Sequence, residues 1–113
     1  MERLVIIPTY NEKENIEAII TAVMELPLEF NVLVIDDGSP DGTAAIVKGL
    51  MAKKYKDRVF LVERSGKLGL GTAYIAGFKW AIEHKAEYIF EMDADCSHNP
   101  QDLLKLYDAC ANQ

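Results

Sequence analysis

Four short apolar runs alternate along the chain with four segments of helical periodicity, and this alternation restricts the fold more than any other feature. The runs cover residues 3–8, 31–35, 58–62 and 88–92, and they are rich in Val, Ile and Leu. Short continuous apolar runs are typical of strands that are buried on both faces of a parallel sheet. The sequence therefore predicts an α/β domain with a Rossmann-like, mostly parallel sheet and helices on both faces.

The segments between the runs carry helix signals. Asn11, with Glu14 three residues later, resembles a capping box. Asn99 and Pro100 predict the start of the last helix, because Asn caps helices and Pro suits the first helical position. The residues expected on buried helix faces are Ile16, Ile19, Ile20, Val23, Val47, Leu50, Met51, Ala73, Gly77, Trp80, His84, Leu103, Leu106, Tyr107 and Cys110.

Size and charge limit the function classes. With 113 residues, half of them hydrophobic, residues 1–113 are expected to form one domain. The net charge of −6 argues against binding to nucleic acid or to an anionic membrane surface, so an anionic substrate would need local basic residues or a metal. No apolar run of about 18 residues and no secretory signal pattern occur. Cys96 and Cys110 lie far apart, which suits a reducing cytoplasm.

The unusual polar residues follow the predicted strands. In open parallel sheets, ligands bind beyond the carboxyl ends of the strands. The segments expected there are residues 9–12, 36–39, 64–71 and 93–99. They contain nearly all of the side chains that are suited to chemistry, so we expect the functional site at this edge of the sheet.

Asp93 and Asp95 give the sharpest signal. Two carboxylates separated by one residue, directly after a buried strand, can both reach a single divalent cation. Mg²⁺ or Mn²⁺ prefers oxygen ligands and commonly shares its shell with substrate phosphates. The alternative is that both are solvated loop acids.

Two further segments allow two interpretations each. Asp36 and Asp37, followed by Ser39, can accept hydrogen bonds from a base or ribose, or can stabilise a turn by binding loop amides. Tyr10 can stack on a nucleobase and Glu12 can accept from its exocyclic donors. Equally, Tyr10 can be a packing residue and Glu12 a favourable anion at a helix N-terminus.

The glycine-rich stretch 66–71 is not a phosphate loop of a common type. Position 61 is Leu where the frame needs Gly, and Leu68 stands where Ser or Thr is needed. Residues 69–74 lack the third small residue of the dinucleotide fingerprint, because position 74 is Tyr. Arg64 and Lys67 are the basic residues best placed to meet a diphosphate, unless they are ordinary surface charges.

Two other classes are disfavoured. The spacing of Cys96, His98, His84 and Cys110 matches no zinc pattern. A phosphotransferase or receiver domain, which also places acids at strand ends, would need a Lys on a later strand that lies beyond this sequence.

Taken in order, the four segments resemble family 2 glycosyltransferases of the GT-A fold, over about residues 4–107. The motifs V-I-I-P-T-Y-N-E, V-I-D-D-G-S-P-D-G-T, R-S-G-K-L-G-L-G-T-A-Y and M-D-A-D-C-S-H-N-P are similar to those of the polyprenyl-phosphate or dolichyl-phosphate mannose synthases in particular. The resemblance implies a site for a nucleotide sugar. The residues that would hold the guanine are Pro8, Tyr10 and Glu12, and those that would face the nucleoside are Asp36 or Asp37 and Ser39.

The resemblance also implies a phosphate and metal site. Lys67 would contact the donor phosphates, and Asp93 and Asp95 would bind Mg²⁺ or Mn²⁺, with Ala94 packed beside the nucleotide. Ser97 stands where one group of relatives has Gln, and a hydroxyl there would ligate the metal weakly or through water. No catalytic base is implied.

The expected function is transfer of mannose from GDP-mannose to a polyprenyl (dolichyl-type) phosphate, with inversion. The Ser97-His98 pair, which resembles the dolichyl type, favours mannose. The alternatives are a UDP-glucose or other donor with another acceptor, and a module that binds a nucleotide diphosphate without transfer. A phosphate monoester has a second pKa of about 6, so at neutral pH most of it has lost both protons. It can therefore attack the anomeric carbon without a base.

The resemblance places the acceptor half downstream of these residues. We therefore expect this stretch to be the nucleotide-sugar-binding portion, with little or no transferase activity alone. The uncovered edge of the fourth strand is expected to favour self-association. The full-length enzyme is expected at the cytoplasmic face of a membrane, as a peripheral protein.

Overall fold

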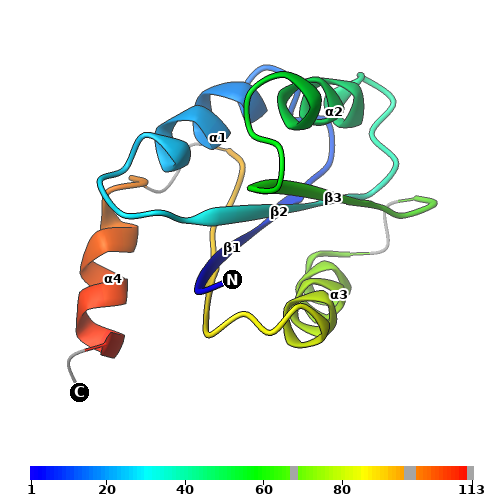
Figure 1. The fold of residues 1–113 in the computed structure, drawn as a ribbon. Coiled ribbons are helices and arrows are strands. Elements are labelled where there is room, and N and C mark those ends of the chain that lie inside the picture. The colour runs from blue at the N-terminus through cyan, green and yellow to red at the C-terminus, as the bar shows by residue number, and fades with distance from the viewer. Residues whose placement is uncertain (67–68, 96–98, 112–113) are drawn as a thin grey trace.

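The computed structural model describes residues 1–66, 69–95 and 99–111, in which strands and helices alternate as predicted (Figure 1). The strands are β1 (Arg3–Thr9), β2 (Asn31–Asp36), β3 (Val59–Glu63) and β4 (Tyr88–Glu91). The helices are α1 (Ile16–Met24), α2 (Thr43–Lys53), α3 (Leu70–Glu83) and α4 (Asp102–Ala111). Each strand lies within one residue of the bounds predicted from its apolar run.

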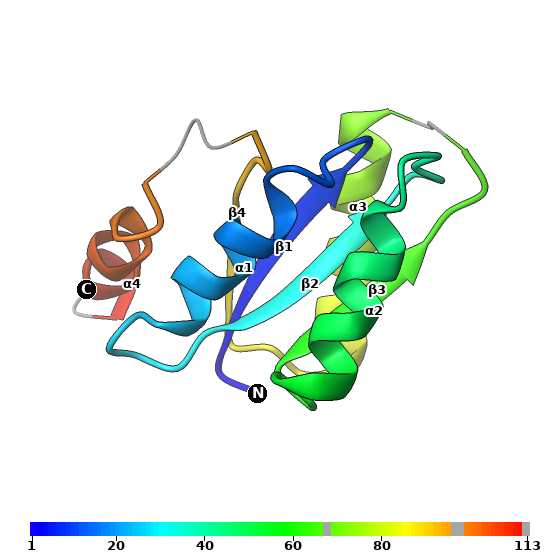
Figure 2. The same cartoon turned by 90° about the horizontal axis from the view of Figure 1, so that it is seen from above.

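The strands form one sheet in the order β3-β2-β1-β4, and all of the described pairs are parallel. β1 and β2 are the central strands and run side by side through the middle of the domain (Figure 2). β2 is buried along its whole length, which agrees with the continuous apolar run at residues 32–35. The parallel arrangement brings the carboxyl ends of β1, β2 and β4 to one edge.

Helices cover both faces of the sheet, as predicted (Figure 1). Val5 and Ile7 of β1 pack into the core that α1, α2 and α4 cover, whereas Leu4 and Ile6 pack into the core that α3 covers. This division follows from the alternation of side chains along a strand. Residues of both cores are fully buried.

The predicted cap at Asn11 is wrong. α1 begins at Ile16, and its N-terminal cap residue, Asn15, makes no capping hydrogen bond with its side chain. Asn11 has a φ angle of +57°, which is outside the helical range, and its N–H donates to the Ser39 hydroxyl at 2.9 Å. The segment before α1 is therefore held by a neighbouring loop instead of by its own capping box.

The predicted start of the last helix is wrong by a few residues. The Asn99 side chain does accept a hydrogen bond from the Gln101 N–H at 3.0 Å, as a cap would. Residues 99–101 nevertheless form a turn, and α4 begins at Asp102. Of its predicted inward face, Leu103 is buried, whereas Leu106 is half exposed.

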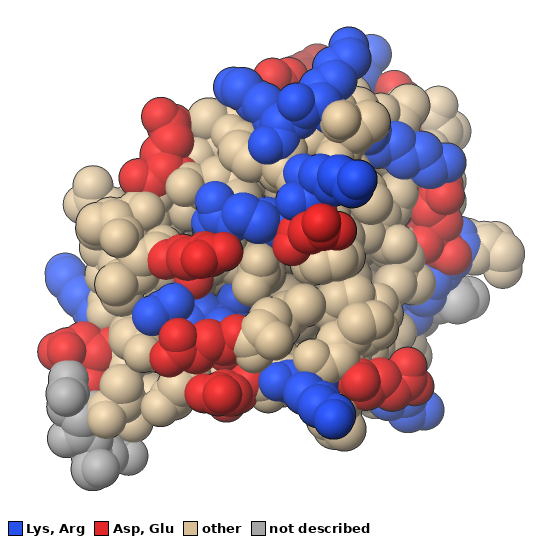
Figure 3. Space-filling model, viewed as in Figure 1, with Lys and Arg blue, Asp and Glu red and all other residues tan. Residues whose placement is uncertain are grey.

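The surface drawn in Figure 3 mixes basic and acidic side chains over most of its area. Lys48 lies 3.0 Å from Glu63, and Arg58 lies 3.7 Å from Glu29. An anionic ligand would meet charges of both signs on this face. Specific attraction of such a ligand must therefore come from a local site.

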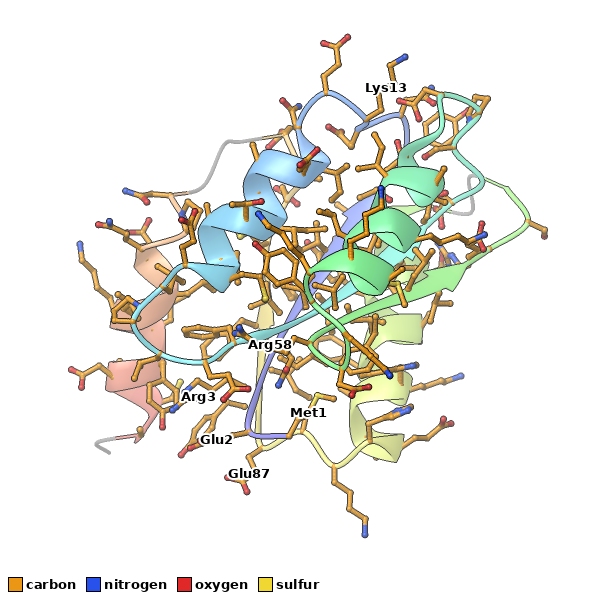
Figure 4. The ribbon with its side chains drawn as sticks, turned by 45° about the horizontal axis from the view of Figure 1, so that its top comes forward. Met1, Glu2, Arg3, Lys13, Arg58 and Glu87 are labelled. Atoms are coloured by element: carbon orange, nitrogen blue, oxygen red, sulfur yellow. The ribbon has the colours of Figure 1, made fainter. Side chains whose placement is uncertain are left out.

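Two arginines stabilise the end of the sheet where the strands begin. Figure 4 places Arg3 and Arg58 near one another and far from Lys13, which lies at the other end. The Arg3 guanidinium stacks 4.4 Å from the Tyr107 ring centre, and Arg58 donates to the Phe30 carbonyl at 2.9 Å. Both arginines therefore have structural contacts with neighbouring residues at this end of the sheet.

A close contact between α3 and β1 leads to a stability prediction. A Cβ atom at Gly77 would lie 2.7 Å from Cγ2 of the fully buried Ile6. Gly77→Val should therefore lower the free energy of unfolding by about 2–3 kcal/mol through overpacking. Gly49→Val on α2 is the matched control, because a Cβ atom at Gly49 would have no neighbouring atom within 4 Å. Chemical denaturation should detect little change there, and equal losses at both sites would contradict the prediction.

The outer edge of β4 bears on the expected self-association. In the described part of the chain β4 pairs with β1 on one side, and no strand pairs with its other side. An unpaired edge can template pairing with another chain. Self-association through this edge remains a prediction that gel filtration can test.

Candidate functional site

A pocket of about 340 Å³ opens at the carboxyl ends of β1, β2 and β4. Three loops and the start of α3 form its walls. The residues that line it are Pro8, Thr9, Tyr10, Glu12, Asp37, Gly69, Leu70, Ala73, Asp93, Ala94 and Asp95. This position agrees with the edge that was predicted from the sequence.

The structure brings most of the predicted site residues into this pocket. They are Pro8, Tyr10, Glu12, Asp37, Asp93, Ala94 and Asp95. Asp36 and Ser39 are not among the lining residues. Lys67 and Ser97 lie outside the described residues, as do Cys96 and His98.

The loop after β1 presents one aromatic and one acidic side chain. Tyr10 is 36% exposed and lines the pocket, and an aromatic side chain at such a position can stack on a flat ligand. Glu12 is partly buried, and its carboxylate accepts a hydrogen bond from the Asn15 side chain at 3.2 Å. Glu12 also accepts backbone hydrogen bonds from Asn15 and Ile16 through its carbonyl, so it both holds the turn before α1 and lines the pocket.

Asp36 has a structural role. It is 1% exposed, and its carboxylate accepts hydrogen bonds from the hydroxyls of Thr9 and Ser39, both at 2.7 Å, and from the Ser39 N–H at 3.0 Å. A carboxylate buried in this way needs such donors. These bonds agree with the turn-stabilising interpretation of Asp36, and Ser39 belongs to the same turn. A contact of Asp36 or Ser39 with a nucleoside stays a prediction.

Asp37 lines the pocket and forms a bidentate ion pair with Arg64. Its two oxygens lie 2.6 Å from Arg64 Nε and 2.9 Å from Nη2. Arg64 also donates to the Thr72 hydroxyl at 3.0 Å and to the Gly69 carbonyl at 3.2 Å. Arg64, one of the two basic residues considered for a diphosphate contact, connects the end of β2 to the start of α3 through these bonds.

Asp93 receives a hydrogen bond that was not predicted. The Tyr74 hydroxyl on α3 donates to Asp93 Oδ1 at 3.2 Å. Burial, together with the negative charge of Asp93, raises the pKa of Tyr74, so the phenol remains a neutral donor. In the sequence, Tyr74 appears only as the residue that breaks a dinucleotide fingerprint. No sequence pattern indicates that its hydroxyl donates to Asp93, which follows β4.

The donor atoms at Asp93 and Asp95 fit a hard divalent cation. Both carboxylates line the same pocket, and the buried Ala94 between them anchors the loop. Among the described residues, no group of three or more His, Cys, Asp or Glu side chains could hold a metal ion. Mg²⁺ and Mn²⁺ suit such a site, because they retain waters and bind substrate phosphates through the remaining positions.

A parallel sheet with an acidic pocket at its carboxyl edge is the arrangement of nucleotide-binding α/β domains. Residues 4–112 match the family model described as Glycosyl transferase family 2. The chain therefore belongs to glycosyl transferase family 2, as its motifs predicted.

Two curated relatives are similar over nearly all of the chain. The polyprenol monophosphomannose synthase of Mycolicibacterium smegmatis is 49% identical over 106 residues, which are 94% of this chain and 40% of the relative. The undecaprenyl-phosphate mannosyltransferase of Micrococcus luteus is 43% identical over 109 residues, which are 96% of this chain and 44% of the relative. The chain thus spans less than half of the length of these relatives.

Solved structures agree with this family. Residues 1–349 of S. aureus TarS have a TM-score of 0.73 and 30% identity, and the match covers 98% of this chain and 32% of that TarS chain. The mannosyltransferase PcManGT from Pyrobaculum calidifontis, solved with GDP-Man and Mn²⁺, has a TM-score of 0.66 and 29% identity. That match covers 71% of this chain and 24% of PcManGT.

Proposed function

We propose that this chain binds GDP-mannose for the transfer of mannose to a polyprenyl (dolichyl-type) phosphate. One observation carries the proposal: the Asp93 and Asp95 carboxylates and the Tyr10 side chain line a single pocket at the carboxyl edge of the sheet. A nucleotide sugar needs both an aromatic surface for its base and charge neutralisation for its diphosphate. The two mannosyltransferase relatives and PcManGT support mannose as the sugar.

The residues of the chain would act by binding and positioning. Tyr10 and Glu12 would hold the base, and Asp37 would accept from the nucleoside. Asp93 and Asp95 would hold Mg²⁺ or Mn²⁺, which supplies charge neutralisation to the diphosphate leaving group. Because a phosphate acceptor is already anionic at neutral pH, no base is required, and a single displacement would invert the anomeric centre.

A UDP-sugar donor is the second candidate. TarS, which matches the whole fold better than PcManGT does, has been solved with UDP and with UDP-GlcNAc. The shared fold therefore accommodates either nucleotide. The greater sequence identity to the two mannosyltransferases favours the GDP-mannose proposal.

Calorimetric titration of the chain with GDP and with UDP, each with and without Mn²⁺, tests the proposal. We expect Mn²⁺ to be required for tight binding, and GDP to bind at least about tenfold more tightly than UDP, a difference of about 1.4 kcal/mol. Tighter binding of UDP would overturn the proposed donor. If GDP binds tightly and equally well with and without Mn²⁺, the proposed metal requirement is overturned.

An assay with labelled GDP-mannose and a polyprenyl phosphate addresses transfer. Product formed by the full-length protein would separate a transferase from a module that only binds nucleotide.

We also propose that the full-length protein works at the cytoplasmic face of a membrane, because its acceptor would be a membrane lipid. Within the described residues, no helix combines the length and the apolar character that a membrane span requires.

A further inference from the structure

Three consecutive backbone amides in the loop after β1 donate to side chains of the loop after β2 and of the first residue of α2. The N–H of Asn11 donates to Ser39 Oγ at 2.9 Å. The N–H of Glu12 donates to Thr43 Oγ1 at 3.0 Å, and the N–H of Lys13 donates to Asp41 Oδ2 at 3.1 Å. We refer to Ser39, Asp41 and Thr43, with these three hydrogen bonds, as the loop clamp.

The acceptors of the loop clamp are themselves fixed. Thr43 is fully buried, and its hydroxyl donates to Asp41 Oδ1 at 2.6 Å while its N–H donates to the same oxygen at 3.0 Å. The Ser39 hydroxyl donates to the buried Asp36 at 2.7 Å. Hydrogen bonds, first of all that from the Thr43 hydroxyl, keep the pKa of Asp41 below its ordinary value, so this acceptor is ionised at neutral pH.

The loop clamp determines the backbone conformation on which Tyr10 and Glu12 depend. Asn11 lies between them with a φ angle of +57°, a left-handed conformation that is uncommon outside Gly but that Asn adopts more often than most residues, and the clamp binds its N–H. The three clamped N–H groups donate to the loop after β2 and to the first residue of α2, and Tyr10 and Glu12 are among the residues that line the pocket. The loop after β1 is therefore held through its backbone, while Tyr10 and Glu12 of the same loop lie at the pocket.

We propose that the loop clamp is a specificity device: Ser39, Asp41 and Thr43 position Tyr10 and Glu12 for one nucleobase and so set the preference for GDP over UDP. This inference rests on the proposed function. The three residues are positioning residues, because they act through the loop after β1. A rigid loop discriminates between bases, since its groups cannot move to satisfy the wrong one.

The matched variants Thr43→Val and Thr43→Ser test the inference. Val keeps the shape of Thr and removes the hydroxyl, whereas Ser keeps the hydroxyl. With Mn²⁺ present, Thr43→Val should weaken GDP binding about tenfold, which is the effect of about 1.4 kcal/mol. It should leave UDP binding nearly unchanged, so that the ratio of the two affinities approaches one. Thr43→Ser should retain the wild-type ratio.

Amide hydrogen exchange in the absence of nucleotide gives a second measurement. The Glu12 N–H should exchange at least about tenfold faster in Thr43→Val than in the wild type, whereas amides of β1 and β2 should be unchanged. Should Thr43→Val not fold, Ser39→Ala provides the same comparison at the Asn11 N–H.

The outcomes distinguish this inference from the proposed function. If the wild type prefers GDP and Thr43→Val shows the same preference, the loop clamp does not set specificity, and the proposed function stands. The inference fails in the same way if Thr43→Ser loses the preference as fully as Thr43→Val, because packing would then be the cause. If the wild type does not prefer GDP, the proposed function and this inference are both overturned.

Discussion

Replacing Asp93 and Asp95 together with Asn is expected to weaken GDP binding in the presence of Mn²⁺ by about 100- to 1,000-fold. Both carboxylates line the pocket at the end of β4, and the neutral amides that replace them bind a hard divalent cation poorly. A bound metal contributes several kcal/mol to the stabilisation of anionic groups, and each 1.4 kcal/mol corresponds to about tenfold in affinity. Calorimetry with and without Mn²⁺ measures the effect.

A control with the same change of charge isolates the metal site. Asp57→Asn with Glu87→Gln also removes two negative charges, but both residues are exposed and precede strands, so they lie at the end of the sheet opposite the pocket. That variant should bind GDP as the wild type does. Without Mn²⁺, all three proteins should bind GDP equally weakly. Unchanged Mn²⁺-dependent binding in the Asp93 and Asp95 variant would refute the account of this site.

Arg64→Met is expected to lower the free energy of unfolding by about 3–5 kcal/mol. The Arg64 and Asp37 side chains are 12% and 8% exposed, and they form a bidentate pair. Removing one partner of a buried ion pair leaves the other charge without compensation, which is more costly than the pair itself is stabilising. Urea denaturation monitored by circular dichroism provides the measurement.

Two further variants make the Arg64 prediction specific. Adding Asp37→Asn to Arg64→Met should recover much of the lost stability, because no buried charge then remains at this pair. Lys48→Met breaks the ion pair with Glu63, in which the side chains are 59% and 49% exposed, and should cost less than about 1 kcal/mol. If Arg64→Met costs no more than Lys48→Met, the Arg64 pair does not hold the loops together.

The fold could be predicted because its signals are local. The apolar runs of β1 and β2 are continuous, which is typical of strands that are buried on both faces. Such strands need helices on both faces of the sheet, so strands and helices alternate along the chain. The edge that carries the pocket follows from the parallel arrangement alone. The same reasoning predicted that Asp93 and Asp95 lie at this edge, since both follow β4 closely, and both residues do line the pocket.

The different roles of neighbouring residues could not be predicted from the sequence. Asp36 and Asp37 are adjacent and chemically identical, yet Asp36 binds the hydroxyls of Thr9 and Ser39, whereas Asp37 faces Arg64 and the pocket. The direction of each side chain depends on the path of the loop after β2. That path depends on contacts with residues that are distant in the sequence.

The failed cap at Asn11 has the same physical origin. A capping box is a local rule, and residues 11–14 satisfy it in sequence. In the folded chain, the side chains of Ser39, Asp41 and Thr43 accept from the N–H groups of residues 11–13, including the Asn11 N–H that Glu14 would bind in a capping box, and the loop takes another conformation. Hydrogen bonds from another loop thus replace the local ones.

By itself, the sequence determined the class of fold, the edge that carries the site, and the pair of acids suited to a cation, because each of these depends on the spacing of residues along the chain. Only the tertiary structure decided that Arg64 pairs with Asp37, that Tyr74 donates to Asp93, and that the loop after β2 and the start of α2 hold the loop after β1. These contacts join segments that meet only after the sheet has formed. Side-chain partners across such distances follow from packing, which no local pattern encodes.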